Sequence, residues 1–235
     1  MDSGRLRRTL LFNAAAGIGL ALTSGLVHAA TRGRAPERDD EEISPAEDLM
    51  REHGVLRRLL LVYEEAGRRL DGNQEFPAEQ VTSAGGIIRH FIEDYHEKLE
   101  EEFVFPRFEK ANELVDLVGI LRTQHQAGRA LTDRVLRLAD GPAMREEAKR
   151  REMGDVLRAF IRLYRPHAAR EDTVLFPAFR PLVGGREYAE LGERFEDREH
   201  ELFGKEGFGG TVAQVAKIEQ SLGLYDLPQF TRPTQ

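Results

Sequence analysis

Apolar residues recur three and four positions apart along most of the chain after residue 44, as in Leu56, Leu59 and Tyr63. This spacing is the period of an amphipathic α-helix that buries one face. It predicts four long helices, over residues 45–70, 77–105, 113–138 and 143–176. No stretch of the sequence shows the polar–apolar alternation of a half-buried strand. Four long helices with short loops predict an all-α, up-down-up-down four-helix bundle.

Local signals mark the ends of these helices. Ser44 can cap the first helix, with Pro45 at its first position and Glu47 in its first turn. Turns rich in glycine, asparagine, aspartate and proline follow the first and third helices, and Pro77 opens the second. Because Pro166 lies inside the fourth pattern, we expect a kink there and a free backbone carbonyl one turn earlier.

A shorter helical extension follows the bundle. The pattern predicts a helix over residues 186–202 and a last helix over residues 212–222, separated by the glycine-rich stretch 204–210. We therefore expect the bundle domain at residues 45–182 and a C-terminal helical extension and tail at residues 183–235.

Residues 1–30 differ from the rest of the chain. Basic residues that include Arg7 and Arg8 precede an apolar run ending near Val27, and small residues follow, which is the pattern of a signal peptide. The Arg-Arg pair with Thr-Leu-Leu after it resembles a twin-arginine signal. An uncleaved anchor is the alternative, because the run is about long enough to span a bilayer. Either interpretation predicts an exported, periplasmic or extracytoplasmic domain, joined through a charged linker at residues 31–44.

The composition limits the classes of function. Hydrophobic residues make up 40% of the chain, which is enough to supply a core. A net charge of −7 with no basic stripe argues against a nucleic-acid partner. The chain contains no Cys, which excludes disulfides, thiolate zinc sites and thioether-linked haem.

The candidate chemistry lies in a motif that occurs twice. His96 precedes Glu100 by four residues, and His167 precedes Glu171 by four residues; each pair is followed by another acid and a closing Phe-Pro. Residues i and i+4 share one face of a helix, so each copy directs an imidazole and a carboxylate the same way. This arrangement is typical of a metal site.

A further His lies upstream of each copy. The step from His53 to His96 is 43 residues and the step from His125 to His167 is 42 residues. A pair of helices therefore occurs twice in the chain, with the same polar residues in the same places.

A single His on a core face is more often a hydrogen-bonded core residue than a metal ligand. Four of them at matching positions would need four separately satisfied imidazoles, and each unsatisfied buried group costs about 1–3 kcal/mol. A metal site removes that cost, and Glu100 and Glu171 then pair with the metal. The alternative is that these acids are solvated, and Asp172, five residues after its His, competes with Glu171.

These residues resemble the hemerythrin family, the HHE cation-binding domain, over about residues 44–182. The resemblance implies a non-haem centre of two Fe ions with a bridging oxo or hydroxo group, with zinc or manganese as alternative occupants. It also implies binding or sensing of O2, peroxide or nitric oxide, or the handling of iron. The family's metal ligands fall here on His53, His96, Glu100, His125, His167 and Glu171 or Asp172.

One His of the family's oxygen carriers is missing. Those proteins have a second His on the third helix, four residues from the first, where this chain has Leu121 and Arg129. Two six-coordinate irons need about twelve ligand positions, and the candidate set with a bridging oxygen fills about ten. An open position favours sensing or redox chemistry over reversible oxygen carriage. Glu93 and Tyr164 could fill it, although a surface charge and a core aromatic are their simpler interpretations.

Three alternatives stay open. A ferritin-like di-iron oxidase would use Glu where the first and third helices here offer His. A haem bundle would leave two His and both acids unexplained. A metal-stabilised or metal-free helical module would act through a partner.

The expected behaviour follows from the centre. We expect a binding protein rather than an enzyme, although weak peroxidase- or oxidase-like activity would be compatible with it. The predicted ligand is a small molecule such as O2, with membrane contact only if the N-terminal segment is retained. The predicted assembly is a monomer or small homo-oligomer, and His90 and His200 are expected at the surface.

Overall fold

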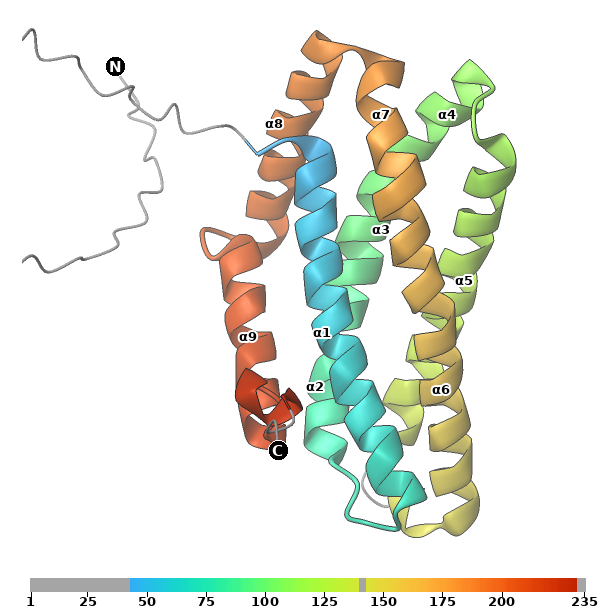
Figure 1. Cartoon of the computed structure of the whole chain (residues 1–235), viewed down its shortest axis with the longest axis vertical. Coiled ribbons are helices and arrows are strands. Elements are labelled where there is room, and N and C mark those ends of the chain that lie inside the picture. The colour runs from blue at the N-terminus through green and yellow to red at the C-terminus, as the bar shows by residue number, and fades with distance from the viewer. Residues whose placement is uncertain (1–42, 140–142, 232–235) are drawn as a thin grey trace, which may run out of the picture. The chain divides into compact units, whose positions relative to one another are not determined.

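The computed structural model describes residues 43–139 and 143–231, and every regular element within these ranges is helical (Figure 1). This confirms the prediction of an all-α fold. The chain divides into two units between Glu41 and Glu42, and all elements below belong to the second unit. The predicted signal peptide or anchor, and all but the end of the predicted linker, lie outside the described residues.

Four long helices form the bundle. The first is α1 (Pro45–Asp71) and the third is α5 (Val115–Leu138). The second helix alternates between α-helical and π-helical geometry, through α2 (Ala78–Ile87), η1 (Ile88–His96), α3 (Glu97–Leu99), η2 (Glu100–Val104) and α4 (Phe105–Ala111). The fourth does the same, through α6 (Glu147–Arg170), η4 (Glu171–Leu175) and α7 (Phe176–Val183), after the short 3₁₀ turn η3 (Ala143–Arg145).

The start of α1 follows the predicted signals. Ser44 is extended, and its side-chain oxygen accepts a hydrogen bond from the Glu47 amide at 3.3 Å. Such a cap is typically worth about 1 kcal/mol. Asn112 and Leu114 adopt left-handed backbone conformations between α4 and α5, which lets three residues reverse the chain.

The second and fourth helices run further than predicted. They end at Ala111 and Val183 rather than at the Phe-Pro dipeptides, because Pro106 and Pro177 lie in the first turn of a new α-helical segment that directly follows a π-helical one. A proline that replaces no needed N–H donor does not end a helix there. Pro166 likewise lies within α6, and the change of helical geometry comes at Glu171 instead of at the proline.

Two further boundaries were predicted wrongly. The fourth helix begins at Glu147 rather than near residue 143, after the 3₁₀ turn. The last helix, α9 (Gly207–Leu222), begins five residues before the predicted start and contains glycines of the stretch 204–210, which was expected to separate the two C-terminal helices. Packing on α1 and α2 overrides the low helix propensity of these glycines.

The core of the bundle is apolar above and below its middle. Tyr63 and Phe160 meet edge to face with ring centroids 5.2 Å apart, and Phe108 and Phe179 lie 6.2 Å apart at the other end. All four side chains are buried, and each fully buried large apolar side chain contributes about 1.5–3 kcal/mol. These layers hold the four helices in fixed register around a polar middle.

The C-terminal helices cover one side of the bundle. The helices α8 (Gly185–Phe203) and α9 pack on α1 and on the second helix, and a short 3₁₀ turn η5 (Leu227–Phe230) follows (Figure 1). Arg58 of α1 donates to Glu219 of α9 over 2.9 Å, and Phe203 packs beside Phe91. Within the described ranges, no helix combines the length and apolar character needed to cross a membrane.

Candidate metal centre

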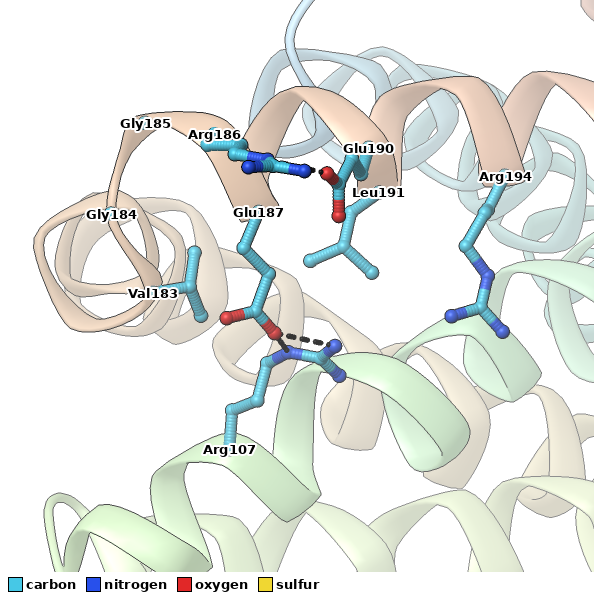
Figure 2. A pocket seen from close by; sticks show the side chains of 9 residues that line it. All are labelled: Arg107, Val183, Gly184, Gly185, Arg186, Glu187, Glu190, Leu191 and Arg194. Atoms are coloured by element: carbon cyan, nitrogen blue, oxygen red, sulfur yellow. Dashed lines mark hydrogen bonds and ion pairs between the residues drawn. The ribbon is translucent and has the colours of Figure 1, made fainter.

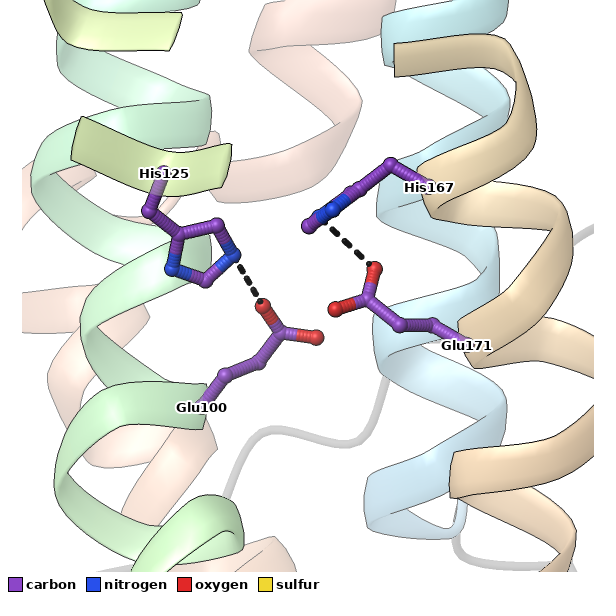
Figure 3. A group of neighbouring side chains, drawn as sticks. All are labelled: Glu100, His125, His167 and Glu171. Atoms are coloured by element: carbon purple, nitrogen blue, oxygen red, sulfur yellow. Dashed lines mark ion pairs between the residues drawn. The ribbon is translucent and has the colours of Figure 1, made fainter. Parts of the chain in front are cut away.

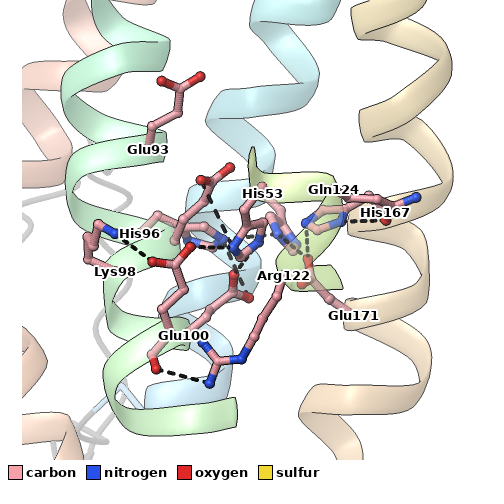
Figure 4. Close-up of polar contacts among 12 residues, drawn as sticks. His53, Glu93, His96, Lys98, Glu100, Arg122, Gln124, His167 and Glu171 are labelled. Carbon is pink, nitrogen blue, oxygen red and sulfur yellow. Dashed lines mark hydrogen bonds and ion pairs between the residues drawn. The ribbon is translucent and has the colours of Figure 1, made fainter. Parts of the chain in front are cut away.

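Six polar side chains meet in the middle of the bundle and form what is here named the histidine cluster. None exposes more than 3% of its surface. They come from all four long helices, as the close-ups of the site show (Figures 3 and 4). The cluster consists of His53, His96, Glu100, His125, His167 and Glu171.

Each carboxylate of the cluster contacts imidazoles from both helix pairs. Oε1 of Glu100 lies 3.8 Å from Nε2 of His96, and Oε2 of Glu100 lies 3.3 Å from Nε2 of His125. Glu171 lies 3.3 Å from Nε2 of His53 and 3.0 Å from Nε2 of His167. Both carboxylates therefore lie between the first and second helix pairs.

The two imidazoles of the first pair also meet. The Nε2 atoms of His53 and His96 are 3.1 Å apart, and their ring centroids are separated by 4.7 Å. The rings of His125 and His167 have centroids 5.0 Å apart. Nitrogen and oxygen donors thus converge on two adjoining positions that share Glu100.

A ring of outer acceptors orients the four imidazoles. Asp172 accepts from Nδ1 of His53 at 2.7 Å, and Glu52 accepts from Nδ1 of His96 at 2.7 Å. The other two acceptors serve the second helix pair in the same way. They are Glu101 at 3.1 Å from Nδ1 of His125 and Gln124 at 2.9 Å from Nδ1 of His167.

The acceptors link the helices in sequence around the bundle. The first helix supplies the acceptor for the second, the second for the third, the third for the fourth, and the fourth for the first. When a ring is neutral and its Nδ1 donates to the acceptor, its Nε2 atom keeps a lone pair toward the middle. Metal-binding imidazoles are held in this way in proteins generally.

The Phe-Pro dipeptides also serve the cluster. Phe105 stacks on the ring of His125, and Phe176 stacks on the ring of His53, both with centroids 5.5 Å apart and planes 27° apart. Glu100 and Glu171 are each the first residue of a π-helical segment that ends just before the dipeptide. Such widened turns often occur at functional sites. Here they direct a carboxylate into the bundle and place the following aromatic ring behind an imidazole.

The carboxylates of the cluster lack partners of their own. Among the residues that the structure describes, neither oxygen of Glu100 nor of Glu171 has a hydrogen-bond partner, and the same holds for Nε2 of His125. Buried carboxylates without partners are costly, and a cation removes that cost. The donor set of imidazole nitrogens and carboxylate oxygens fits divalent transition metals. The cluster can therefore hold a metal.

Burial and neighbouring charges shift the pKa values within the cluster in different directions. Burial and the charge of Glu171 raise the pKa of Glu100 well above its usual range. Burial acts the same way on Glu171, but His167 and His53 outweigh it and lower the pKa of that carboxyl. Burial together with the charge of His53 lowers the pKa of His96, so this ring stays neutral and can donate its lone pair.

Three further candidates lie outside the cluster. Asp172 pairs with Nδ1 of His53 and with Arg57, so Glu171 is the acid of the fourth helix that enters the middle. Glu93 pairs with Arg89 at 2.7 Å and accepts from Thr132 at 2.5 Å.

Tyr164 is the third candidate outside the cluster. It donates to Glu97 over 2.7 Å and meets the ring of His167 edge to face at 5.5 Å. At the positions of the missing His, Leu121 is buried and Arg129 pairs with Glu97 at 2.8 Å. Because of these contacts, none of the three candidates (Asp172, Glu93 and Tyr164) adds a metal-binding atom to the cluster.

The sequence interpretation missed the outer acceptors Glu52, Glu101 and Gln124. Each is directly next to a cluster residue in the sequence but serves an imidazole on a neighbouring helix. An acidic or amide residue directly beside His53, Glu100 and His125 was the available signal. His90 and His200 are exposed, as expected.

Two surface pockets lie away from the histidine cluster. One pocket of about 530 Å³ lies where α7 meets α8 and is lined by three arginines and two glutamates, of which Arg107 pairs with Glu187 and Arg186 pairs with Glu190 (Figure 2). A larger groove of about 890 Å³ lies between the second helix and α9. Neither contains a residue of the histidine cluster.

The fold and the cluster together define a class: a helical bundle with a buried, imidazole-rich cation site. The family model of the hemerythrin HHE cation-binding domain matches residues 44–203, and the chain belongs to this family. The match includes α8 as well as the four-helix bundle.

Relatives at the sequence level share nearly the whole chain. The chain is 47% identical over 221 residues to uncharacterized protein Rv1995 of Mycobacterium tuberculosis (strain ATCC 25618 / H37Rv). It is equally similar to uncharacterized protein Mb2018 of Mycobacterium bovis. Each alignment covers 93% of this chain and 87% of the relative. No solved structure matches the chain.

Proposed function

We propose that the histidine cluster holds two iron ions and that the protein binds or senses O2 or a related small oxidant. The observation that carries this proposal is the position of the two carboxylates. Glu100 and Glu171 each contact one imidazole of either helix pair, and all four of their oxygens lack hydrogen-bond partners among the described residues. Two cations with shared carboxylates account for both facts.

The residues divide into two sets of donors. His53 and His96 would hold one ion, His125 and His167 would hold the other, and Glu100 and Glu171 would be shared. The bound irons would supply reversible electron transfer and an attachment point for a small ligand. The protein keeps each Nε2 directed inward through the outer acceptors, and it excludes bulk water with the stacked rings of Phe105 and Phe176.

Sensing is favoured over oxygen transport by the contacts of the third helix. Leu121 offers no donor, and Arg129 is engaged with Glu97 and Glu101. Glu93 and Tyr164 have partners of their own. A coordination position therefore remains for an exchangeable ligand such as O2, peroxide or nitric oxide.

Iron quantification with absorption spectroscopy tests the proposal. The purified protein should contain about two irons per chain and show near-ultraviolet charge-transfer bands typical of oxo-bridged iron bound by His, as expected for such donors. Adding O2 to the reduced protein should change the spectrum. A Soret band, or colourless protein that carries only zinc, would contradict the proposal.

A variant pair localises the metal. Changing His125→Ala should lower the iron content, because it removes one Nε2 donor from a buried site. Changing the exposed His90→Ala should not, because His90 lies outside the cluster and pairs with Asp94. Full iron retention in the first variant would contradict the assignment of the third helix.

A further inference from the structure

A second group of acids adjoins the histidine cluster on the side covered by α8. Asp48 and Glu52 lie one turn apart on α1, and Glu199 reaches them from α8. One carboxylate oxygen of each lies within 4.8 Å of the others. Glu52 is fully buried, Glu199 is 7% exposed, and the Asp48 side chain is 14% exposed.

Each acid of this group uses one of its oxygens elsewhere. The backbone N–H of Phe208 donates to Oε1 of Glu199 at 2.7 Å, and Arg51 pairs with Oδ1 of Asp48 at 3.3 Å. Glu52 bonds Nδ1 of His96 through Oε2. One partner per carboxylate leaves a second oxygen on each for another interaction.

An independent observation indicates that something is bound there. Oε1 of Glu52 is buried and has no well-aligned hydrogen-bond partner in the described part of the chain; the neighbouring hydroxyl of Tyr95, also buried, does not make such a bond with it. A buried carboxylate oxygen without a partner is costly unless it is paired or coordinates a metal. Three carboxylates this close also repel one another, and a cation between them converts that repulsion into attraction.

The fold holds the third acid in place at a specific position. Gly207, the first residue of α9, has a left-handed backbone conformation, and a Cβ there would lie 1.8 Å from Oε1 of Glu199. Only a glycine lets the Glu199 carboxylate approach the start of α9 and remain beside α1. The C-terminal extension therefore does more than cover the bundle, because it contributes one of the three acids.

We propose that Asp48, Glu52 and Glu199 form a further divalent-cation site, built of oxygen donors alone and joined to the histidine cluster through Glu52. Oxygen-only sites suit hard cations such as Mn²⁺, Mg²⁺ and Ca²⁺, whereas imidazole-rich sites suit iron and zinc. The two sites thus select different chemistry although they share a neighbour. The site does not depend on which metal fills the histidine cluster.

Binding of Mn²⁺ to the full-length, metal-loaded protein tests this site. Electron paramagnetic resonance of free Mn²⁺ gives the amount bound, and the metal of the histidine cluster is quantified before and after the titration. We expect one Mn²⁺ per chain beyond the metal already present, with Mg²⁺ or Ca²⁺ competing. Absence of binding, or binding that only replaces metal released from the cluster, would overturn the proposal.

Matched variants identify the donors. Glu199→Gln and Asp48→Asn come from different helices, and each should weaken Mn²⁺ binding at least about tenfold while leaving the metal of the histidine cluster in place. Asp197→Asn, on the exposed face of α8, should bind Mn²⁺ as the unmodified chain does. Since the two site variants alter different helix contacts, unfolding of one still leaves the other informative; unchanged affinity in a folded Glu199→Gln or Asp48→Asn variant would overturn the site.

Discussion

The two helix pairs place the same groups against the middle of the bundle but differ just outside it. Before its first His, the first pair has Glu52 and the second pair has Gln124. Three residues after its first His, the first pair has Leu56 and the second pair has Gly128. Three residues before its second His, the first pair has Glu93 and the second pair has Tyr164. The residues that face the cluster are thus repeated, whereas residues one position or one turn away have diverged.

The difference changes the electrostatics of the two halves. In the first half, carboxylates orient both imidazoles, whereas in the second half Glu101 orients His125 and a neutral amide, Gln124, orients His167. A carboxylate acceptor makes its imidazole a stronger donor. We expect the first half to hold its metal more tightly, and this half is joined to the acids beside α8 through Glu52.

Removing the metal is the strongest disturbance of this arrangement. The stripped protein keeps buried carboxylates without partners, so its free energy of unfolding should fall by about 4 kcal/mol or more, as for a ligand held at about 1,000 times its Kd. Thermal melting with and without a chelator measures the effect, and added Fe²⁺ should restore the melting temperature. An unchanged melting temperature would show that the cluster is stable without a cation.

Much of the fold and the inner residues of the cluster follow from the sequence. The apolar period predicted the four long helices. The doubled His-x3-Glu motif placed His96 with Glu100 on one helix face and His167 with Glu171 on another, because i and i+4 share a helix face. Those patterns are local.

What the sequence did not reveal depends on contacts between helices. Glu52 looks like any helix-surface acid in the sequence, yet it is fully buried against His96 of another helix. Glu199 reaches α1 only because α8 folds back along the first pair. Phe-Pro was interpreted as a helix end, since nothing local reveals the π-helical segment that accommodates each proline.

Gly128 and Tyr164, two positions at which the second helix pair differs from the first, pack tightly against each other, and a substitution tests this packing. A Cβ at Gly128 would lie 2.0 Å from the hydroxyl of Tyr164, so Gly128→Ala should destabilise the fold by about 1–3 kcal/mol through overpacking. Gly119→Ala on the same helix has open space around it and should stabilise by up to about 1 kcal/mol. Urea unfolding measures both, and equal effects would contradict the close packing of Tyr164.

Exchanging the outer acceptors tests the difference between the halves. Glu52→Gln should lower metal affinity by about 10–100-fold, because it removes the carboxylate that orients His96. Gln124→Glu gives the second half the same chemistry and should maintain or raise affinity. Competition with a chelator measures both variants. A larger loss of metal affinity in Gln124→Glu than in Glu52→Gln would contradict the proposal that the first half holds its metal more tightly.

The smallest effect is a pH dependence confined to the first pair. Burial and the charge of Glu199 raise the pKa of Asp48 from 3.8 to about 6, and Arg51 opposes them. The folded state therefore holds a proton on Asp48 that the unfolded chain has released, and stability falls as pH rises from 3.8 to about 6. A difference of one pKa unit corresponds to about 1.4 kcal/mol in the free energy of unfolding. Because Asp48 is partly open to water, which screens its charge, we expect a smaller loss of stability, about 1 kcal/mol in all.

Comparison with Asp48→Asn isolates this contribution, since pH effects on the histidine cluster occur in both proteins and cancel. Without added divalent cation, the variant should gain stability relative to the unmodified chain as pH rises through this window. Asp197→Asn, on the exposed face of α8, should show no such gain. Added Mn²⁺ should reverse the order, because a cation at Asp48, Glu52 and Glu199 stabilises the charged carboxylate and makes its loss costly. If the difference in stability between Asp48→Asn and the unmodified chain were the same at every pH, with and without Mn²⁺, these acids would not be the source of a pH dependence or of cation binding in the first pair.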